Sequence, residues 1–229
     1  YMMASVVAVA LLLTAGTGHA VQFSGSATGV FSAPTPLIGR VYSGVGTNVF
    51  ETGDPVSGQP SGNILQIDGL SFNDVDEGNA FAVADFSYYN SVTKLNSSVD
   101  TVSVDFEVVF TAPPGVPDQI FNFSFDFDIT PNVTGDPVLD ADKLTPQGVF
   151  SDTNFLYNDR LYTLELLGFS DDGGATIVDF FLLPENQTAY SQLFARITSV
   201  PAVPEPATLT LMAAGLAGLG LHLRRRRSA

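Results

Sequence analysis

Two stretches of the sequence decide the fold: Val102–Phe110 reads VSVDFEVVF, and Phe121–Ile129 reads FNFSFDFDI. In both, apolar side chains alternate with polar ones, which is the period of a β-strand and not of a helix. A turn-rich connection, TAPPGVPDQ at 111–119, separates them. The alternation therefore predicts two half-buried antiparallel strands. The side chains predicted to fill the core are Phe106, Val108, Phe110, Phe121, Phe123, Phe125 and Phe127.

Shorter apolar runs extend this pattern along the chain. Clusters of Gly, Pro, Asn and Asp separate the runs, as at Asp171–Gly174. We predict an all-β fold, an antiparallel two-sheet β-sandwich of jelly-roll-like type with about eight strands. The further strands are predicted at Thr47–Glu51, Asn63–Asp68, Ala80–Tyr89, Leu161–Leu167, Ala175–Leu182 and Tyr190–Thr198.

The central part of the chain lacks the side chains that most catalysis and metal binding require. Cys and Trp are absent throughout, and His and Met occur only before residue 21 and after residue 202. This excludes a thiol nucleophile, a His general base, a Ser-His-Asp triad and the usual zinc and haem ligands. We therefore predict that the protein is not an enzyme. The catalytic alternative that stays open is a glycoside hydrolase that uses two carboxylates.

The central part is also strongly acidic. Residues 21–202 contain five basic and 23 acidic side chains, a net charge of −18. Such a surface repels nucleic acid and anionic lipid and favours cations or cationic polymers. We therefore expect no nucleic-acid partner. Solubility outside the cell is the simpler explanation of the same charge.

The N-terminal residues 1–20 are typical of a signal peptide. Val6–Leu13 is apolar, and Gly18–Ala20 has the small-x-small pattern of a cleavage site, which predicts cleavage between Ala20 and Val21. A transmembrane helix is the alternative, although this run is too short to span a bilayer. A basic segment usually precedes such an apolar run, but residues 1–5 contain no Lys or Arg, and the sequence begins with Tyr1. We therefore expect the signal peptide to be incomplete at its N-terminus.

The C-terminal residues 203–229 combine a proline motif, an uncharged segment and a basic end. The uncharged segment 207–223 would form a helix about 26 Å long, close to the roughly 30 Å of a hydrocarbon core. Positive charge resists translocation, so the arginines are expected to remain cytoplasmic and to stop export of the chain. The motif consists of Val203, Pro204, Glu205 and Pro206, and the stop of Arg224, Arg225, Arg226 and Arg227.

This order of motif, transmembrane helix and basic end resembles the PEP-CTERM sorting signal of bacterial surface proteins. The resemblance implies that a membrane-embedded exosortase removes the tail, much as a GPI signal is removed. The expected partners are the exosortase, the secretion machinery and the membrane. The expected route is an inner-membrane-anchored precursor, followed by the cell surface or the extracellular space. A plain C-terminal anchor is the alternative.

Within the ectodomain, residues 21–202, most of residues 23–198 resembles the choice-of-anchor K family and its THxN relatives. The resemblance is carried by Phe31–Pro34, Gly44–Asn48, Phe81–Asn90 and Tyr162–Phe169. At the family's Thr-His-x-Asn position the chain reads SYYN, so that only Asn90 matches. The resemblance implies a β-rich surface domain and no established activity.

Clustered aspartates are candidates for a calcium site, because calcium binds six to eight oxygen ligands from flexible loops. The candidates on and after the second strand are Asp126, Asp128, Asp136, Asp140 and Asp142, and a second group lies at Asp74–Glu77. Neither group has the spacing of an EF-hand or of a glycine-rich calcium repeat. A solvated polar face of the sandwich is the alternative.

Three functions follow from these observations. The first is a structural protein of the cell surface or extracellular matrix, associated with exopolysaccharide. The second is a lectin-like module that binds carbohydrate through Tyr, Asn and Asp, with calcium as a candidate ion. The third is a hydrolase based on paired carboxylates.

Overall fold

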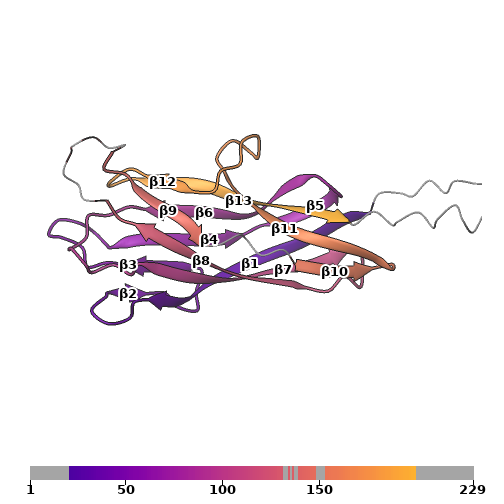
Figure 1. The fold of residues 1–229 in the computed structure, drawn as a ribbon, viewed down its shortest axis with the longest axis horizontal. Coiled ribbons are helices and arrows are strands. Elements are labelled where there is room, and N and C mark those ends of the chain that lie inside the picture. Colours follow the sequence, from indigo (N-terminus) through magenta and orange to yellow (C-terminus); the bar gives the residue numbers. More distant parts are fainter. Residues whose placement is uncertain (1–20, 131–133, 135, 137–138, 148–152, 200–229) are drawn as a thin grey trace, which may run out of the picture.

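The fold of the described chain consists of strands, turns and loops. The computed structural model describes residues 21–130, 134, 136, 139–147 and 153–199. Within these ranges all regular structure is β-strand, and no residue is helical (Figure 1). The same ranges contain no helix that is long and apolar enough to span a membrane. The prediction of an all-β fold is confirmed.

The strands form two antiparallel sheets (Figure 1). The strands of the six-stranded sheet are, in spatial order, β12 (Phe181–Leu183), β9 (Asp142–Gln147), β8 (Gln119–Asp128), β7 (Thr101–Ala112), β1 (Gln22–Thr35) and β5 (Ser71–Asp76). Those of the seven-stranded sheet are β10 (Thr153–Tyr157), β11 (Arg160–Ser170), β13 (Thr188–Ser199), β6 (Ala80–Tyr89), β4 (Asn63–Gly69), β3 (Val49–Thr52) and β2 (Tyr42–Ser43).

The core lies between the sheets and is rich in phenylalanine. Aromatic rings from the two sheets meet across it, as Phe86 of β6 does with Phe125 of β8, at 5.6 Å between ring centroids. Phe23 of β1 contacts Tyr162 of β11 at 5.3 Å, in the same edge-to-face manner. Edge-to-face packing favours such ring pairs beyond the area that they bury. The two-sheet prediction is therefore confirmed, in a β-sandwich-like form.

The central pair of strands is antiparallel, as predicted, and most of its predicted core residues are buried. β7 and β8 pair antiparallel, with Phe106 opposite Phe121. Of the predicted core residues, Phe110 is only partly buried and packs against the edge of the core. The alternation also ends earlier than predicted, because β8 stops at Asp128 and Ile129 is 40% exposed. The remaining predicted core residues are buried: Phe106, Val108, Phe121, Phe123, Phe125 and Phe127.

The sequence did not predict β1, although it pairs with β7 in the middle of the sheet. Its inward positions include Gly25 and Gly29, which weaken the apolar alternation. A Cβ on Gly29 would lie 2.9 Å from Ile67 and 3.0 Å from Phe106. Glycine is therefore required there because large side chains of both sheets approach the β1 backbone.

The predicted strand Ala175–Leu182 is wrong over most of its length. The structure has bends at 171–176, an isolated bridge at Val178, and a strand only at Phe181–Leu183. Asp172 folds the loop, because its Oδ1 accepts hydrogen bonds from the Ser170 hydroxyl (2.7 Å) and from the Thr176 amide (2.9 Å). These bonds lower the pKa of Asp172 to about 2. Four short strands were also missed: β2, β5, β9 and β10.

Candidate functional site

The two ends of the described β-domain are held together at one turn. Gln22, at the start of β1, pairs with Asp76 at the end of β5. At the end of β13, the backbone N–H of Ser199 donates to Glu77 Oε1 at 3.1 Å. Arg160 Nη2 lies 3.0 Å from the same carboxylate oxygen. The β5–β6 turn therefore contacts both the first and the last strand of the domain.

The polypeptide thus enters and leaves the domain at the same end (Figure 1). We call it the proximal end and define it by Gln22, Asp76–Asn79 and Ser199. The opposite, distal end is formed by the connections that follow β1, β6 and β8 and by the one that precedes β13. The antiparallel strands run between these two ends, so that the distal loops lie a full strand length away from both chain exits.

The distal end holds a buried acidic side chain, Asp142, at the start of β9. Asp142 is 2% exposed, and its Oδ1 accepts a hydrogen bond from the Thr130 amide at 2.8 Å. Its Oδ2 is buried without a hydrogen-bond partner. Burial, together with repulsion from Glu185 and Asp128, outweighs the hydrogen bonds from Thr130 and raises the pKa of Asp142 from 3.8 to about 6. Burial, with Asp142 and Glu185 nearby, also raises the pKa of Tyr88 well above 10.0.

Next to Asp142 and its neighbours, a pocket of about 520 Å³ opens among the loops of the distal end; we call it the distal pocket. Arg40, Phe127 and Glu185 are among its lining residues. Arg40 is occupied, because it donates to the Asn96 carbonyl oxygen and lies 3.6 Å from Asp100. Arg40, which lines the pocket, therefore also holds two of the distal loops against each other.

The calcium candidates do not converge. Asp126 faces outward on β8 and accepts a hydrogen bond from Gln147 at 2.7 Å, whereas Asp142 is buried. Asp140 accepts hydrogen bonds from Thr134, and Asp136 from Leu139. Among the residues that the structure describes, no three His, Cys, Asp or Glu side chains are grouped closely enough to hold a metal ion. Asp128 lies at the end of β8, opposite Lys143, and Asp74–Glu77 belongs to the proximal end.

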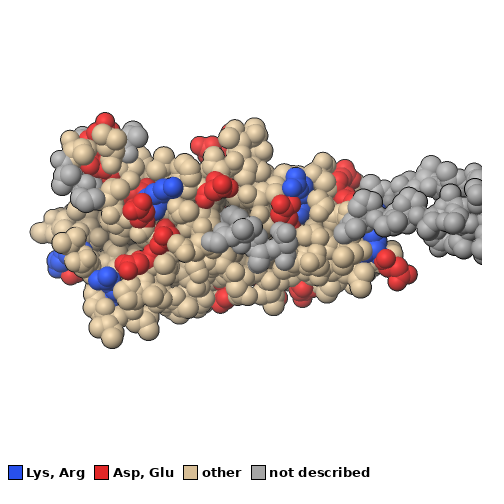
Figure 2. Space-filling model, viewed as in Figure 1, with Lys and Arg blue, Asp and Glu red and all other residues tan. Residues whose placement is uncertain are grey.

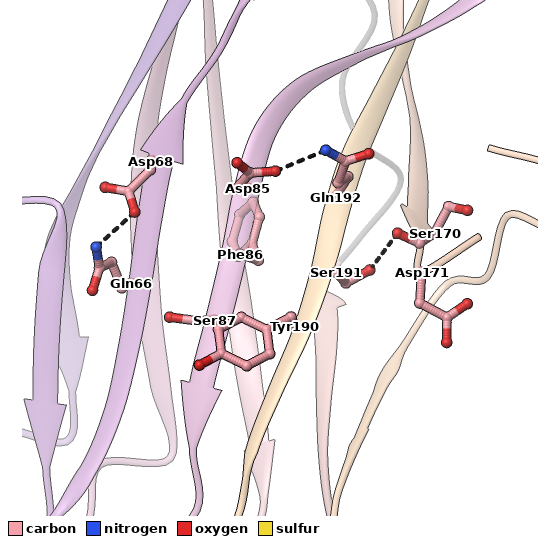
Figure 3. Close-up of a pocket in the computed structure, with 10 residues that line it drawn as sticks. All are labelled: Gln66, Asp68, Asp85, Phe86, Ser87, Ser170, Asp171, Tyr190, Ser191 and Gln192. Carbon is pink, nitrogen blue, oxygen red and sulfur yellow. Dashed lines mark hydrogen bonds between the residues drawn. The ribbon is translucent and has the colours of Figure 1, made fainter. Parts of the chain in front are cut away.

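A second depression, of about 490 Å³, lies on the outer face of the seven-stranded sheet (Figure 3). We call it the outer groove. Its floor spans β4, β6 and β13, whose outward side chains form two rows across the sheet. One row is Gln66, Ser87 and Tyr190, and the other is Asp68, Asp85 and Gln192.

Amide side chains hold the two carboxylates of the outer groove. Gln66 Nε2 donates to Asp68 Oδ2 at 2.6 Å, and Gln192 Nε2 donates to Asp85 Oδ1 at 2.8 Å (Figure 3). Asn48 Nδ2 donates to the other oxygen of Asp68 at 2.9 Å. Each carboxylate offers about four acceptor positions, so acceptors remain for a ligand. The groove is therefore a preorganised set of hydrogen-bonding groups on rigid strands.

The surface of the domain is acidic, as its composition predicts. Figure 2 shows carboxylates spread along one face of the molecule, with few basic groups among them. Several basic groups are engaged by acids: Lys94 lies 2.6 Å from Asp54, and Arg196 lies 2.8 Å from Glu165. Since these cations are neutralised locally, the field around the domain is that of its excess carboxylates.

Sequence reasoning predicted the strands of the outer groove but not the groove itself. β4, β6 and β13 were all expected close to their observed bounds. Their alternation also indicates which side chains face outward. The missing information was the order of the strands, because β13 lies next to β6 although about a hundred residues separate them.

The predicted sorting residues lie outside the described residues. These are Val203–Pro206, the helix 207–223 and Arg224–Arg227, together with the signal peptide 1–20 and its cleavage position Ala20.

Comparison with known proteins supports the C-terminal prediction. No curated protein matches the chain. The resemblance of the ectodomain to the choice-of-anchor K family stays a prediction. Residues 202–227 match the family described as the PEP-CTERM protein-sorting motif. The chain therefore carries the sorting motif of an exported protein that exosortase processes from a membrane-anchored precursor.

Proposed function

We propose that the protein is a structural component of the bacterial cell surface or extracellular matrix, sorted there by exosortase. The observation that carries the proposal is the PEP-CTERM motif at residues 202–227. In this proposal the apolar segment 207–223 holds the precursor in the inner membrane, and Arg224–Arg227 stop its export. The surface or matrix is then the destination of the β-domain after its tail is removed.

The geometry of the proximal end supports this role. Pro204 follows Ser199 by five residues, which reach at most about 18 Å when fully extended. The β-domain of the precursor would therefore stand directly above the membrane, with its proximal end toward the enzyme. The distal loops and the sheet faces would point away from the cell, where other surface molecules are met.

We further propose that the domain acts without catalysis. It has no Cys or His between residues 21 and 202, and among the described residues no three His, Cys, Asp or Glu side chains are grouped so that they could hold a metal ion. The elongated sheets with a Phe-rich core are suited to a durable scaffold, because a large buried apolar area stabilises the fold without disulfides.

A second candidate function, carbohydrate binding, is favoured by the outer groove. Its carboxylates, amides, hydroxyl and exposed aromatic ring match the hydroxyl groups and apolar faces of a sugar. A glycan-binding matrix protein would combine both functions, since it would attach extracellular polysaccharide to a protein layer.

The sorting proposal is tested in a host that has the matching exosortase. Pro204, Glu205 and Pro206 are replaced together by Ala, and membrane, surface and medium fractions are compared by immunoblotting. The variant is expected to stay in the membrane fraction at full length, whereas the wild-type protein leaves it. A variant released as efficiently as the wild type contradicts the proposal. Replacement of Asp105 and Glu107 by Ala, at exposed positions of β7 outside the motif, serves as the control.

A further inference from the structure

We propose that the outer groove binds a glycan that carries free amino groups. This inference rests on the second proposed function, carbohydrate binding, and assigns it a site and a ligand class. The site is the surface formed by two neighbouring rows, one of Gln66, Ser87 and Tyr190 and the other of Asp68, Asp85 and Gln192.

The first argument is the placement of two like charges. Asp68 and Asp85 are direct cross-strand partners on β4 and β6, and both are exposed on the outer face. Like charges opposite one another destabilise a sheet. An ammonium group placed between the two carboxylates relieves this repulsion and donates up to three hydrogen bonds. The pair therefore favours a ligand that carries a positive charge.

The second argument is the absence of competing cations. Among the described residues that line the groove, none is Lys, Arg or His. Arg196 lies four residues along β13 from Gln192, and it pairs with Glu165 at 2.8 Å. Asp171, from the loop after β11, adds a further carboxylate to the lining. The groove thus attracts a cationic ligand and repels glycans that carry uronate or sulfate.

The third argument distinguishes an amino-glycan from a simple cation. Tyr190 is 71% exposed and stands next to Ser87, in the row beside that of the two carboxylates (Figure 3). An exposed aromatic ring offers an apolar face on which a sugar ring can stack, with a hydroxyl at its edge. Gln66 and Gln192 supply amide groups that match sugar hydroxyls in both donor and acceptor roles. These groups are unnecessary for binding an inorganic cation.

The fourth argument is preorganisation. Gln66 is fixed by its bond to Asp68, and Gln192 by its bond to Asp85. All four side chains project from neighbouring strands of one sheet, so a ligand need not order a loop when it binds. The groove can therefore bind a short oligosaccharide at a small entropic cost.

The experiment is a titration of the full-length chain, kept in detergent, with three hexasaccharides that differ in charge. These are β-1,4-linked glucosamine, its N-acetylated form and glucose in the same linkage. Calorimetry is expected to show the strongest binding for the glucosamine hexamer, weakened by added salt. D68N/D85N and Y190A are each expected to lower the affinity about tenfold or more.

The control is D105N, which removes an exposed carboxylate from β7 on the other sheet and should leave the affinity unchanged. D68N/D85N keeps the size of both side chains and removes a repulsion, but residue 68 then has one acceptor oxygen for the two amides of Asn48 and Gln66, so the melting temperature should change by only a few degrees. If D68N/D85N and the wild type bind the glucosamine hexamer with equal affinity, the proposal that the outer groove is the binding site is wrong. Tighter binding of the acetylated or glucose hexamer overturns the ligand class, yet leaves carbohydrate binding itself standing.

Discussion

Glu77 holds Ser199 at the point where the chain leaves the β-domain. One carboxylate oxygen, Oε1, accepts hydrogen bonds from both the backbone N–H and the hydroxyl of Ser199. Ser199 is the last residue of β13, and the sorting motif follows a few residues later. The contact therefore fixes the last residue of β13, after which the chain continues toward the segment that exosortase reads.

Replacement of Glu77 by Ala should loosen this end of the domain. It removes the acceptor of Ser199 and the partner of Arg160, and hydrogen bonds to a charged group are each worth about 1.5–3 kcal/mol. We expect a loss of about 1–3 kcal/mol in the free energy of unfolding by urea, with faster amide exchange at residues 197–199. E107Q, at an exposed position of β7, is the control. Unchanged exchange at 197–199 contradicts the role given to Glu77.

The centre of the core should be sensitive to a single truncation. Phe125 is fully buried and contacts Phe86 and Phe169 across the core. Phe125→Ala removes that packing and leaves a cavity, so it should cost about 3–5 kcal/mol in the free energy of unfolding. Ile120→Ala on the same strand is the control, because Ile120 is 61% exposed and its loss should cost about 0.5 kcal/mol or less. Equal effects of the two substitutions would show that β8 does not face the core as described.

Asp142 should make the protein less stable as pH rises from about 4 to about 6. The pKa of Asp142 is about 6 in the folded protein, and its ordinary value of 3.8 applies to the unfolded chain. Between these two pH values the folded protein therefore holds a proton that the unfolded chain has released. The penalty is complete above pH 6 and amounts to at most about 3 kcal/mol. D142N should therefore be more stable than the wild type at pH 8.

The pH dependence is checked by urea unfolding of D142N and the wild type at pH 4, 6 and 8. Other carboxylates titrate in both proteins, so the difference between the two curves isolates Asp142 and its neighbours Glu185 and Asp128. This difference should grow between pH 4 and pH 6 and then remain constant. D105N should show no such growth. A difference that is independent of pH contradicts the raised pKa.

Calcium is expected to leave the stability unchanged. A bound ion would raise the melting temperature through preferential binding to the folded state. The described candidates bond to neighbouring protein groups and do not gather around one point. Thermal scans in millimolar calcium and in chelator should therefore coincide. An increase of several degrees in calcium would restore the predicted site at Asp126–Asp142.

The sequence predicted the fold where the apolar alternation was strong. Phe121–Phe127 contains a large apolar side chain at every second residue, so both the strand and its buried face could be recognised. β1 could not, because Gly25 and Gly29 occupy inward positions only on account of Ile67, Phe72 and Phe106 from distant segments. Close approach between strands is a tertiary property that no local pattern reveals.

The same reasoning explains the outcome at the candidate sites. The aspartates of 126–142 are close in sequence, yet the pleat of β8 and β9 sends Asp126 outward and Asp142 into the core. The outer groove instead joins Asp68, Asp85 and Gln192 from three strands. The pleat decided the first result and strand order the second, and strand order depends on the whole chain rather than on any single segment.

The central claim, that exosortase removes the C-terminal tail, is tested most directly by intact-mass analysis of the protein released to the surface of a host with its exosortase. The account predicts a mass that lacks residues 207–229, because the enzyme reads Val203–Pro206 and separates the domain from the apolar segment and Arg224–Arg227. A released protein that retains residues 207–229 would identify the segment as a plain anchor and contradict the account.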